Sequence, residues 1–262
     1  MKLKKHLGQH LLVAGGVIGR IGELINPQEG DVLVEIGPGT GNLTREILRY
    51  PFKELHLIEI DPDMVERLKE LLEEGRVKIH GADAVSFDFC SLGESLKLYG
   101  NLPYNVASLI VENTVFHHKC ITQAVYMLQK EVAEKLQKGS SWLSTFVKTF
   151  YEVEYLMSLP ARFFRPPPKV QSGLVRLLRK ENLPELDLVE YRDFLTRLYA
   201  MKRKALKSKL EESLLTKVSI DPMRRVESLS LEEVLLLFHL SKSPTRPPAS
   251  IWNIGAPKER EI

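Results

Sequence analysis

Short apolar runs alternate with amphipathic stretches along the first half of the chain. Apolar runs that end in polar residues or glycines predict five strands, at residues 31–36, 55–60, 77–80, 98–100 and 124–128. Apolar side chains recur at helical spacing in residues 42–50, after Pro62 and in residues 107–116. This alternation predicts an α/β fold with a doubly wound, Rossmann-like parallel sheet and right-handed crossovers.

The pattern changes after residue 150. Residues 153–178 are rich in strand formers and are interrupted by Pro160 and by three consecutive prolines at 166–168, which predicts a long hairpin added to the sheet edge. Beyond residue 184 the spacing is helical, and the predicted helices are residues 190–199, 202–215 and 231–240, the last with a capping box at Ser230.

These changes predict three parts of the chain. Residues 1–183 form the α/β domain, and residues 184–240 form a small all-α domain. Residues 241–262 are proline-rich and lack periodicity, which is typical of a disordered tail.

The average composition is that of a globular protein, but the charge is unevenly distributed. The 262 residues include 37 Lys+Arg and 34 Asp+Glu, for a formal charge of +3. Residues 1–10, 162–180 and 202–209 together carry 14 of these basic side chains and no acidic one. If the three segments converge in the fold, they form a face for anions, and a nucleic-acid backbone is the natural partner.

Only two cysteines are present, Cys90 and Cys120, too few for a disulfide framework or a four-ligand zinc site. We therefore expect two free, buried thiols and no metal. No apolar stretch approaches the roughly 18 residues that a bilayer requires. The basic start followed by LLVAGGVIG superficially resembles a signal peptide, but polar residues interrupt it and no A-x-A site follows. We expect a cytoplasmic monomer.

A glycine cluster follows the first predicted strand. In EIGPGTG, the residues Gly37, Gly39 and Gly41 allow a sharp turn and the close approach of a ligand. Glu59 ends the second strand about 20 residues later, where an acidic residue binds ribose hydroxyls, and Asp83 ends the third, within reach of an adenine amino group. Both NAD and S-adenosylmethionine (SAM) fit such a cleft.

The fourth strand decides between them, because it runs into Asn101-Leu102-Pro103-Tyr104. This sequence is similar to the [DNS]-[IPL]-P-[YFW] motif of amino-methylating SAM-dependent methyltransferases. The Asn101 oxygen and a neighbouring carbonyl can accept both hydrogens of an adenine amine and stabilise the charge that develops on it. Pro103 adds no N–H donor, and Tyr104 offers a stacking face.

Taken together, the motifs of residues 2–240 resemble the KsgA/Dim family of small-subunit rRNA adenine dimethyltransferases. The matching stretches are KKHLGQHLL, EIGPGTGNLT, LIEID, GADA, NLPYN, MLQKEVAEKL, FFRPPPKVQSGLVRL and RRVESLSLEE. The resemblance implies SAM-dependent dimethylation of N6 of two adjacent adenosines in a hairpin near the 3′ end of small-subunit rRNA, in a precursor of the subunit.

The resemblance also implies site residues. SAM would contact His10, Leu12, Gly37, Glu59, Asp83 and Asn101, beside the glycine turn of Gly39 and Gly41. Asn101 through Tyr104 would hold the target amine, and Phe164 would lie near the flipped adenine. The basic residues expected to hold RNA phosphates are Lys4, Lys5, Arg165, Lys169, Arg203, Lys204 and Lys207.

The chain departs from the family pattern at two places. Leu11 replaces the phenylalanine usual in GQ[NH]FL, so an aromatic cover over the cofactor is missing or comes from elsewhere. The residues after Ser241 match nothing in the pattern.

Three alternatives remain. A large-subunit rRNA dimethyltransferase of the macrolide-resistance type shares most of these motifs, although the triple proline and RRVESLSLEE favour the small-subunit enzyme. A ribosome-assembly factor could keep the fold without the activity. An NAD oxidoreductase is least favoured, since no placed histidine provides an acid for hydride transfer.

Overall fold

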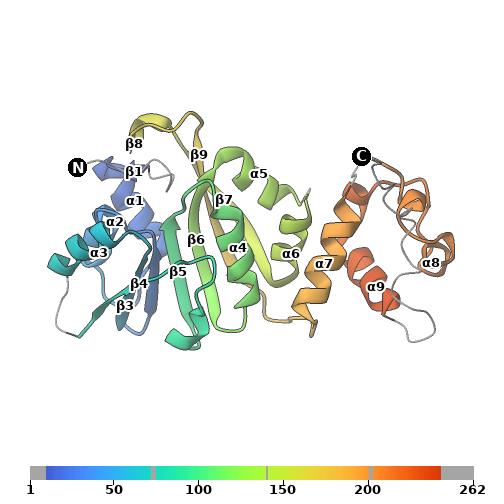
Figure 1. Ribbon diagram of the computed structural model, residues 1–262, viewed down its shortest axis with the longest axis horizontal. Coiled ribbons are helices and arrows are strands. Elements are labelled where there is room, and N and C mark those ends of the chain that lie inside the picture. The colour runs from blue at the N-terminus through green and yellow to red at the C-terminus, as the bar shows by residue number, and fades with distance from the viewer. Residues whose placement is uncertain (1–9, 72–74, 140, 201–202, 243–262) are drawn as a thin grey trace, which may run out of the picture. The chain divides into compact units, whose positions relative to one another are not determined.

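The fold is built on one mixed sheet. The computed structural model describes residues 10–71, 75–139, 141–200 and 203–242. In this part of the chain, a seven-stranded sheet has the order β4-β3-β2-β5-β6-β9-β7 (Figure 1). Its strands are β2 (Val32–Ile36), β3 (Glu54–Glu59), β4 (Val77–Gly81), β5 (Leu96–Asn101), β6 (Ile121–Gln129), β7 (Tyr151–Leu159) and β9 (Ser172–Arg179).

The strands β2 to β6 confirm the predicted parallel half of the sheet. They pair in parallel, and α2 (Asn42–Ile47), α3 (Pro62–Leu68) and α4 (Ala107–Phe116) lie in the crossovers. Pro62 is in the first turn of α3, where its missing N–H leaves no bond unmade, and the Asp61 carboxylate caps this helix by accepting the N–H of Asp63. The rhythm of the sequence therefore predicted this architecture correctly.

The predicted edge hairpin is also confirmed. β7 and β9 are antiparallel, and β9 lies between β7 and β6. The connection contains β8 (Phe164–Arg165), which pairs with β1 (Leu11–Leu12) as a separate two-stranded sheet. The proline tract is thus in the connecting segment, where its lack of N–H donors breaks no ladder of the main sheet.

Three helices were not predicted: α1 (Gly15–Ile25), α5 (Lys130–Lys138) and α6 (Trp142–Phe150). Four glycines give α1 a weak intrinsic helix propensity, and no side chain caps its start. Its apolar face nevertheless buries Ile18, Ile21 and Ile25 in the core, so packing rather than propensity stabilises it. The segment that superficially resembles a signal peptide runs into this helix.

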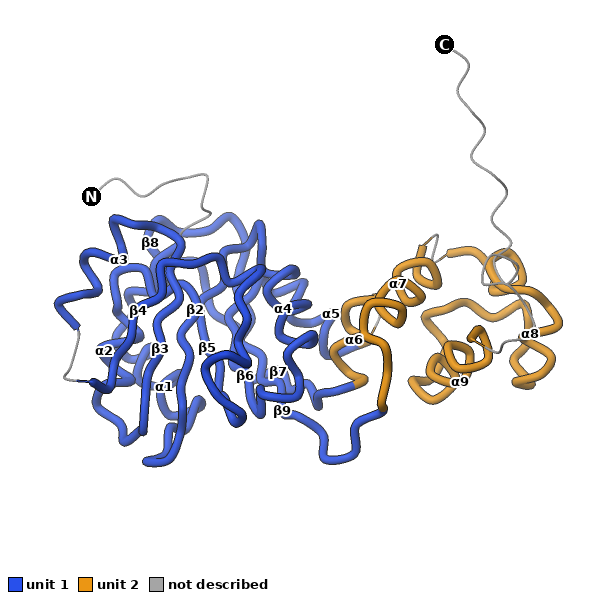
Figure 2. Tube along the Cα trace, turned by 60° about the horizontal axis from the view of Figure 1, so that its bottom comes forward, with its two compact units in different colours: residues 1–138, 150–184 blue, residues 139–149, 185–262 orange. Residues whose placement is uncertain are grey.

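The chain divides into two compact units (Figure 2). One contains the residues up to Lys138 and Phe150–Pro184; the other contains Gly139–Thr149 and the chain from Glu185 onward. The second unit includes most of α6 with α7 (Leu188–Tyr199), α8 (Glu212–Lys217) and α9 (Leu231–Ser241). Hydrogen bonds between hydroxyl groups attach α6 to α7: Thr145 with Tyr199 at 2.6 Å, and Thr149 with Tyr191 at 3.0 Å.

The predicted helix over residues 202–215 is wrong. Among the described residues of this stretch, only a short 3-10 turn at Leu206–Ser208 and the start of α8 are helical. The N–H of Leu206 donates to the Arg224 carbonyl and that of Lys207 to Pro222, so tertiary hydrogen bonds replace the helical ones. The other predicted helices of this unit are confirmed, including the capping box of Ser230 with Glu233.

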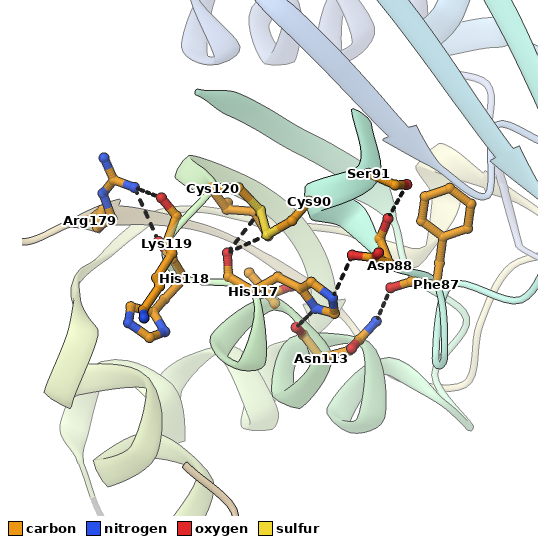
Figure 3. Close-up of a disulfide and its surroundings, with 12 residues drawn as sticks. Phe87, Asp88, Cys90, Ser91, Asn113, His117, His118, Lys119, Cys120 and Arg179 are labelled. Atoms are coloured by element: carbon orange, nitrogen blue, oxygen red, sulfur yellow. Dashed lines mark hydrogen bonds and ion pairs between the residues drawn. A yellow bond between two sulfur atoms is a disulfide. The ribbon is translucent and has the colours of Figure 1, made fainter. Parts of the chain in front are cut away.

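The expectation of two free thiols is wrong. Cys90 and Cys120 form a disulfide with Cα atoms 5.4 Å apart (Figure 3), and Cys90 is exposed. Beside it, His117 Nε2 lies 3.3 Å from the Asp88 carboxylate (Figure 3). The sequence gives no sign of this pairing, because only the fold brings the segment after β4 against the turn between α4 and β6.

We expect this disulfide to stabilise the protein. It joins residues 30 apart in sequence and encloses β5 and α4. Loop-closure entropy for a ring of this size corresponds to about 3.5 kcal/mol. The double variant Cys90→Ser, Cys120→Ser should unfold at a temperature about 10 °C lower, measured by calorimetry. A reductant should lower the melting temperature of the wild type and leave that of the variant unchanged; equal melting temperatures for both proteins would contradict a stabilising role.

Within the described part of the chain, every helix is too short or too polar to span a bilayer.

Candidate functional site

The carboxyl edge of the parallel strands brings four predicted site residues to one place. Gly37 follows β2, Glu59 ends β3, Asp83 follows β4 and Asn101 ends β5. The strands are paired so that Ile36 lies opposite both Ile58 and Gly100, which aligns their ends. Ligands of doubly wound sheets bind at this edge.

The glycine turn requires glycine at each predicted position. Gly37, Gly39 and Gly41 have φ values of 65°, 55° and 76°, in the left-handed region that other residues avoid. A Cβ atom on Gly39 would also lie 2.8 Å from the Leu11 side chain. The turn therefore packs closely beneath Leu11, which takes the place of the phenylalanine expected there.

Glu59 is 4% exposed and is hydrogen-bonded to the glycine turn. Its carboxylate accepts the N–H of Gly39 at 3.1 Å and the N–H of Asp61 at 2.9 Å. Burial raises the pKa of Glu59, and the two backbone hydrogen bonds oppose that shift. Glu59 thus places an acidic group beside the turn and fixes the shape of the turn.

A pocket of about 110 Å³ opens between the ends of β2, β3, β4 and the start of α4. Asp83 lies on its rim, exposed, with its carboxylate accepting the N–H of Val85 at 2.9 Å. Most of the wall is apolar, with few polar groups. The lining residues are Ile36, Gly37, Ile58, Glu59, Ile60, Ala82, Asp83, Ala84, Pro103, Asn105, Val106 and Ile110.

The amide of Asn101 is oriented by a hydrogen bond. Its Nδ2 donates to the backbone carbonyl of His10, and its oxygen has no hydrogen-bond partner among the described residues. Asn101 also lines two pockets of about 30 Å³, one of which is shared with His10, Leu11, Gly37, Leu102, Pro103 and Tyr104. An acceptor oxygen is therefore available at a small polar slot beside the larger pocket.

The rest of the NLPY segment has distinct roles. The Leu102 side chain is 1% exposed, and its N–H donates to the Met127 carbonyl at 3.2 Å, so Leu102 anchors the segment to β6. The Tyr104 hydroxyl hydrogen-bonds the Ser172 hydroxyl at 2.5 Å. The Tyr104 ring lies 5.5 Å from the His10 ring, so its plane is set from two sides.

The segment of His10 and Leu12, which the sequence predicted to contact SAM, also lines this site, although its short strand β1 was not predicted. Leu12 is nearly buried, lines one of the small pockets and accepts the side-chain amide of Asn42 at its carbonyl. Phe164, its pairing partner in β8, is 1% exposed and belongs to the core. The structure therefore gives Phe164 a packing position, and Phe164 lines none of the three pockets described above.

Glu35 is a second carboxylate of the site to which we assigned no role from the sequence. It is 2% exposed and accepts hydrogen bonds from the hydroxyls of Thr44 at 2.7 Å and Tyr99 at 3.1 Å. Burial raises its pKa to about 7. The sequence did contain a sign of this residue, a glutamate within the apolar run VLVEI. A carboxylate is rarely buried unless other groups bind it or it has a functional role.

The basic residues predicted to bind phosphates are only partly described by the structure. Lys4 and Lys5 lie outside the described residues, while Arg165, Lys169, Arg203, Lys204 and Lys207 are exposed. Other basic residues of the same segments interact with groups of the protein itself. Arg176 pairs with Glu154, and the Lys209 amine is buried and donates to the Leu198 carbonyl. The charge available for an anion is thus smaller than the sequence count indicates.

Comparison with known proteins identifies the family. Residues 1–242 match the family described as ribosomal RNA adenine dimethylase. The chain belongs to this family. Two relatives named ribosomal RNA small subunit methyltransferase A are similar over most of their length. The one from Sulfurihydrogenibium sp. is 42% identical, covering 94% of this chain and 99% of the relative; the one from Persephonella marina is 44% identical, covering 90% and 92%.

Solved structures agree with this adenine dimethylase fold. A dimethyladenosine transferase from Plasmodium falciparum has a TM-score of 0.77 at 24% identity, over 94% of this chain and 100% of that chain. The 23S rRNA methyltransferase ErmE has a TM-score of 0.67 at 26% identity, over 87% and 98%. Within the described residues, no cluster of three or more histidines, cysteines or carboxylates could hold a metal ion.

We expect Glu35 to make stability depend on pH. Its folded pKa of about 7 lies above its ordinary value of 4.5, so the folded state retains a proton that the unfolded state has released. Stability from this group is present below pH 4.5 and is lost as pH rises through 7, by roughly 1 kcal/mol per pH unit.

Denaturant titrations at pH 5.5, 6.5 and 7.5 test this expectation. Glu35→Gln, which keeps an acceptor for Thr44 and Tyr99, should lack the part of the decline that Glu35 contributes. Parallel curves for wild type and variant over this range would contradict a raised pKa.

Proposed function

We propose that this protein uses SAM to dimethylate N6 of two adjacent adenosines in the 3′-terminal hairpin of small-subunit rRNA. Its family and the names of its similar relatives support this activity. The observation that carries the chemistry is the oriented amide of Asn101, with its oxygen available at a slot beside the pocket that Glu59 and Asp83 line. We place the reaction in the cytoplasm, during ribosome biogenesis, with a monomeric enzyme.

The larger pocket suits the cofactor. Glu59 and Asp83 offer carboxylates for ribose hydroxyls and an adenine amine, and the apolar walls of Ile36, Ile60 and Ile110 suit a purine ring. His10, Leu12 and the turn of Gly37, Gly39 and Gly41 would hold the remainder beside Asn101. When bound, SAM supplies a methyl group made electrophilic by its sulfonium sulfur.

Asn101 has the central role in the proposed mechanism. Because its Nδ2 is bound to the His10 carbonyl, its oxygen accepts an N–H of the target amine. Accepting that hydrogen raises the electron density on the nitrogen and stabilises the positive charge that develops during transfer. Pro103 adds no N–H donor beside this nitrogen. The Tyr104 ring, fixed by Ser172 and His10, provides a face on which the base stacks.

This arrangement explains why two methyl groups are added. A monomethylated amine still carries one N–H, which the Asn101 oxygen can accept for a second transfer. A dimethylated amine carries none, so the product loses this hydrogen bond. The same slot therefore favours both transfers and then weakens product binding.

The large-subunit alternative is less well supported. The similar relatives with a small-subunit name are 42–44% identical over most of the chain, whereas ErmE is 26% identical. Labelled SAM supplied with each unmodified subunit precursor separates the two activities. Label in the small subunit supports the proposal; label in the large subunit alone would overturn it.

We expect Asn101→Ala to separate binding from transfer. The variant should bind SAM within about threefold of wild type by calorimetry, because most of the pocket wall is unchanged. Its methyl transfer to unmodified small subunits should fall by about 10²–10³-fold, typical for the loss of one transition-state hydrogen bond.

Asn182→Ala is a control for this measurement, since Asn182 is an exposed asparagine far from the motif in sequence. Its turnover should equal that of the wild type. Wild-type turnover in Asn101→Ala would refute the proposed role of the amide.

We expect Arg203→Glu with Lys204→Glu to weaken RNA binding and leave SAM affinity intact. Both residues are exposed, and removing two phosphate contacts should reduce the slope of log K against log salt by nearly 2. Filter binding at several salt concentrations measures this. The control is Lys217→Glu with Arg225→Glu. These two residues are also exposed and belong to the same compact unit, so the control makes the same charge change at another place. If both pairs weaken binding equally, the effect is one of net charge and the assignment fails.

A further inference from the structure

The His10 side chain connects two segments that are 62 residues apart. Its Nδ1 lies 2.8 Å from the Pro166 carbonyl oxygen, and its ring lies 5.5 Å from the Tyr104 ring. Its own backbone carbonyl accepts the amide of Asn101. One residue therefore contacts the proline-tract connection and both polar ends of the NLPY motif.

The chemistry of these partners sets the direction of each bond. The Pro166 carbonyl oxygen can only accept, so His10 Nδ1 must carry the hydrogen. The His10 carbonyl likewise can only accept, so Asn101 must present its NH2 group to it and its oxygen to the slot. The orientation of the Asn101 amide thus depends on where the backbone of His10 lies.

Among the described residues, few other hydrogen bonds place that backbone. β1 and β8 are two-residue strands, and their pairing begins at Leu11 with Arg165. The next bond, from the Val13 N–H to the Phe163 carbonyl at 2.9 Å, lies further from Asn101. Such short pairings are weak alone. The His10–Pro166 hydrogen bond extends the pairing by one residue, to the point where the carbonyl of His10 meets Asn101.

We infer that His10 is a positioning residue for methyl transfer, acting through its ring hydrogen bond to Pro166. This inference rests on the proposed function. The bond holds the His10 carbonyl against the Asn101 amide, and the ring supports Tyr104 from one side. His10 therefore contributes to the rate of transfer, in addition to any contact between its backbone and the cofactor.

The variants His10→Ala, His10→Phe and His10→Asn test this role. His10→Ala removes both ring contacts, and His10→Phe keeps a ring beside Tyr104 without the N–H donor. His10→Asn retains a side-chain N–H that can reach a nearby carbonyl. We expect kcat to fall by about 10–100-fold in the first two, as small misplacements of reacting groups do. We expect His10→Asn to stay within about fivefold of wild type.

The KM for SAM distinguishes positioning from direct binding. It should change by less than about threefold in all three variants, because the ring points to Pro166 and Tyr104. A raised KM with unchanged kcat in His10→Ala would instead assign the ring to cofactor binding and overturn the inference. Equal losses of kcat in all three variants, including His10→Asn, would also overturn it, since the N–H donor would then not be the cause.

Two controls complete the experiment. His239→Ala removes a similar bond, from a histidine Nδ1 to the Leu235 carbonyl within α9, and should leave kcat and KM unchanged. Melting temperatures of all variants separate lost activity from lost folding. If the wild type transfers no methyl groups to any ribosomal subunit, the proposed function fails; if it transfers them and His10→Ala does so equally well, only this inference fails.

Discussion

The hydrogen bond between the Asn101 amide and the His10 carbonyl decides which chemistry the site can perform. An asparagine side chain can present either a donor or an acceptor, and the two alternatives differ by a rotation of 180° about one bond. Binding of Nδ2 by a carbonyl leaves the oxygen for the ligand. With the opposite orientation the site would offer an N–H to an amine that becomes positively charged, and transfer would be opposed.

Several elements of the first unit serve to maintain this geometry. β5 places Asn101 beside the glycine turn, and Gly100 permits this because a Cβ there would collide with the Ile36 backbone. The Glu59 carboxylate holds the turn by accepting the Gly39 N–H. Leu102 anchors the motif to β6, and Tyr104 is tied to β9 through Ser172. The antiparallel hairpin is thus more than an addition to the sheet, because it supplies a support for the base-stacking residue.

The sequence was sufficient to predict the parallel strands and the residues at their carboxyl ends. The parallel strands have visible apolar runs, and the residues at their ends, Gly37, Glu59, Asp83 and Asn101, follow from where such sheets bind ligands. Features built from long-range contacts could not be predicted. β1 is two residues long, too short to show an alternation of apolar and polar residues. The Cys90–Cys120 disulfide joins segments that only the fold brings together. Lys209 belongs to a basic run in the sequence, but its amine donates to the buried Leu198 carbonyl.

A crystal structure with S-adenosylhomocysteine and adenosine bound tests the central claim most directly. The account predicts that the Asn101 oxygen lies about 3 Å from N6 of the adenine while Nδ2 remains on the His10 carbonyl. It also predicts the adenine ring against Tyr104. An Asn101 side chain turned away from N6, or an amide whose NH2 group faces it, would contradict the account.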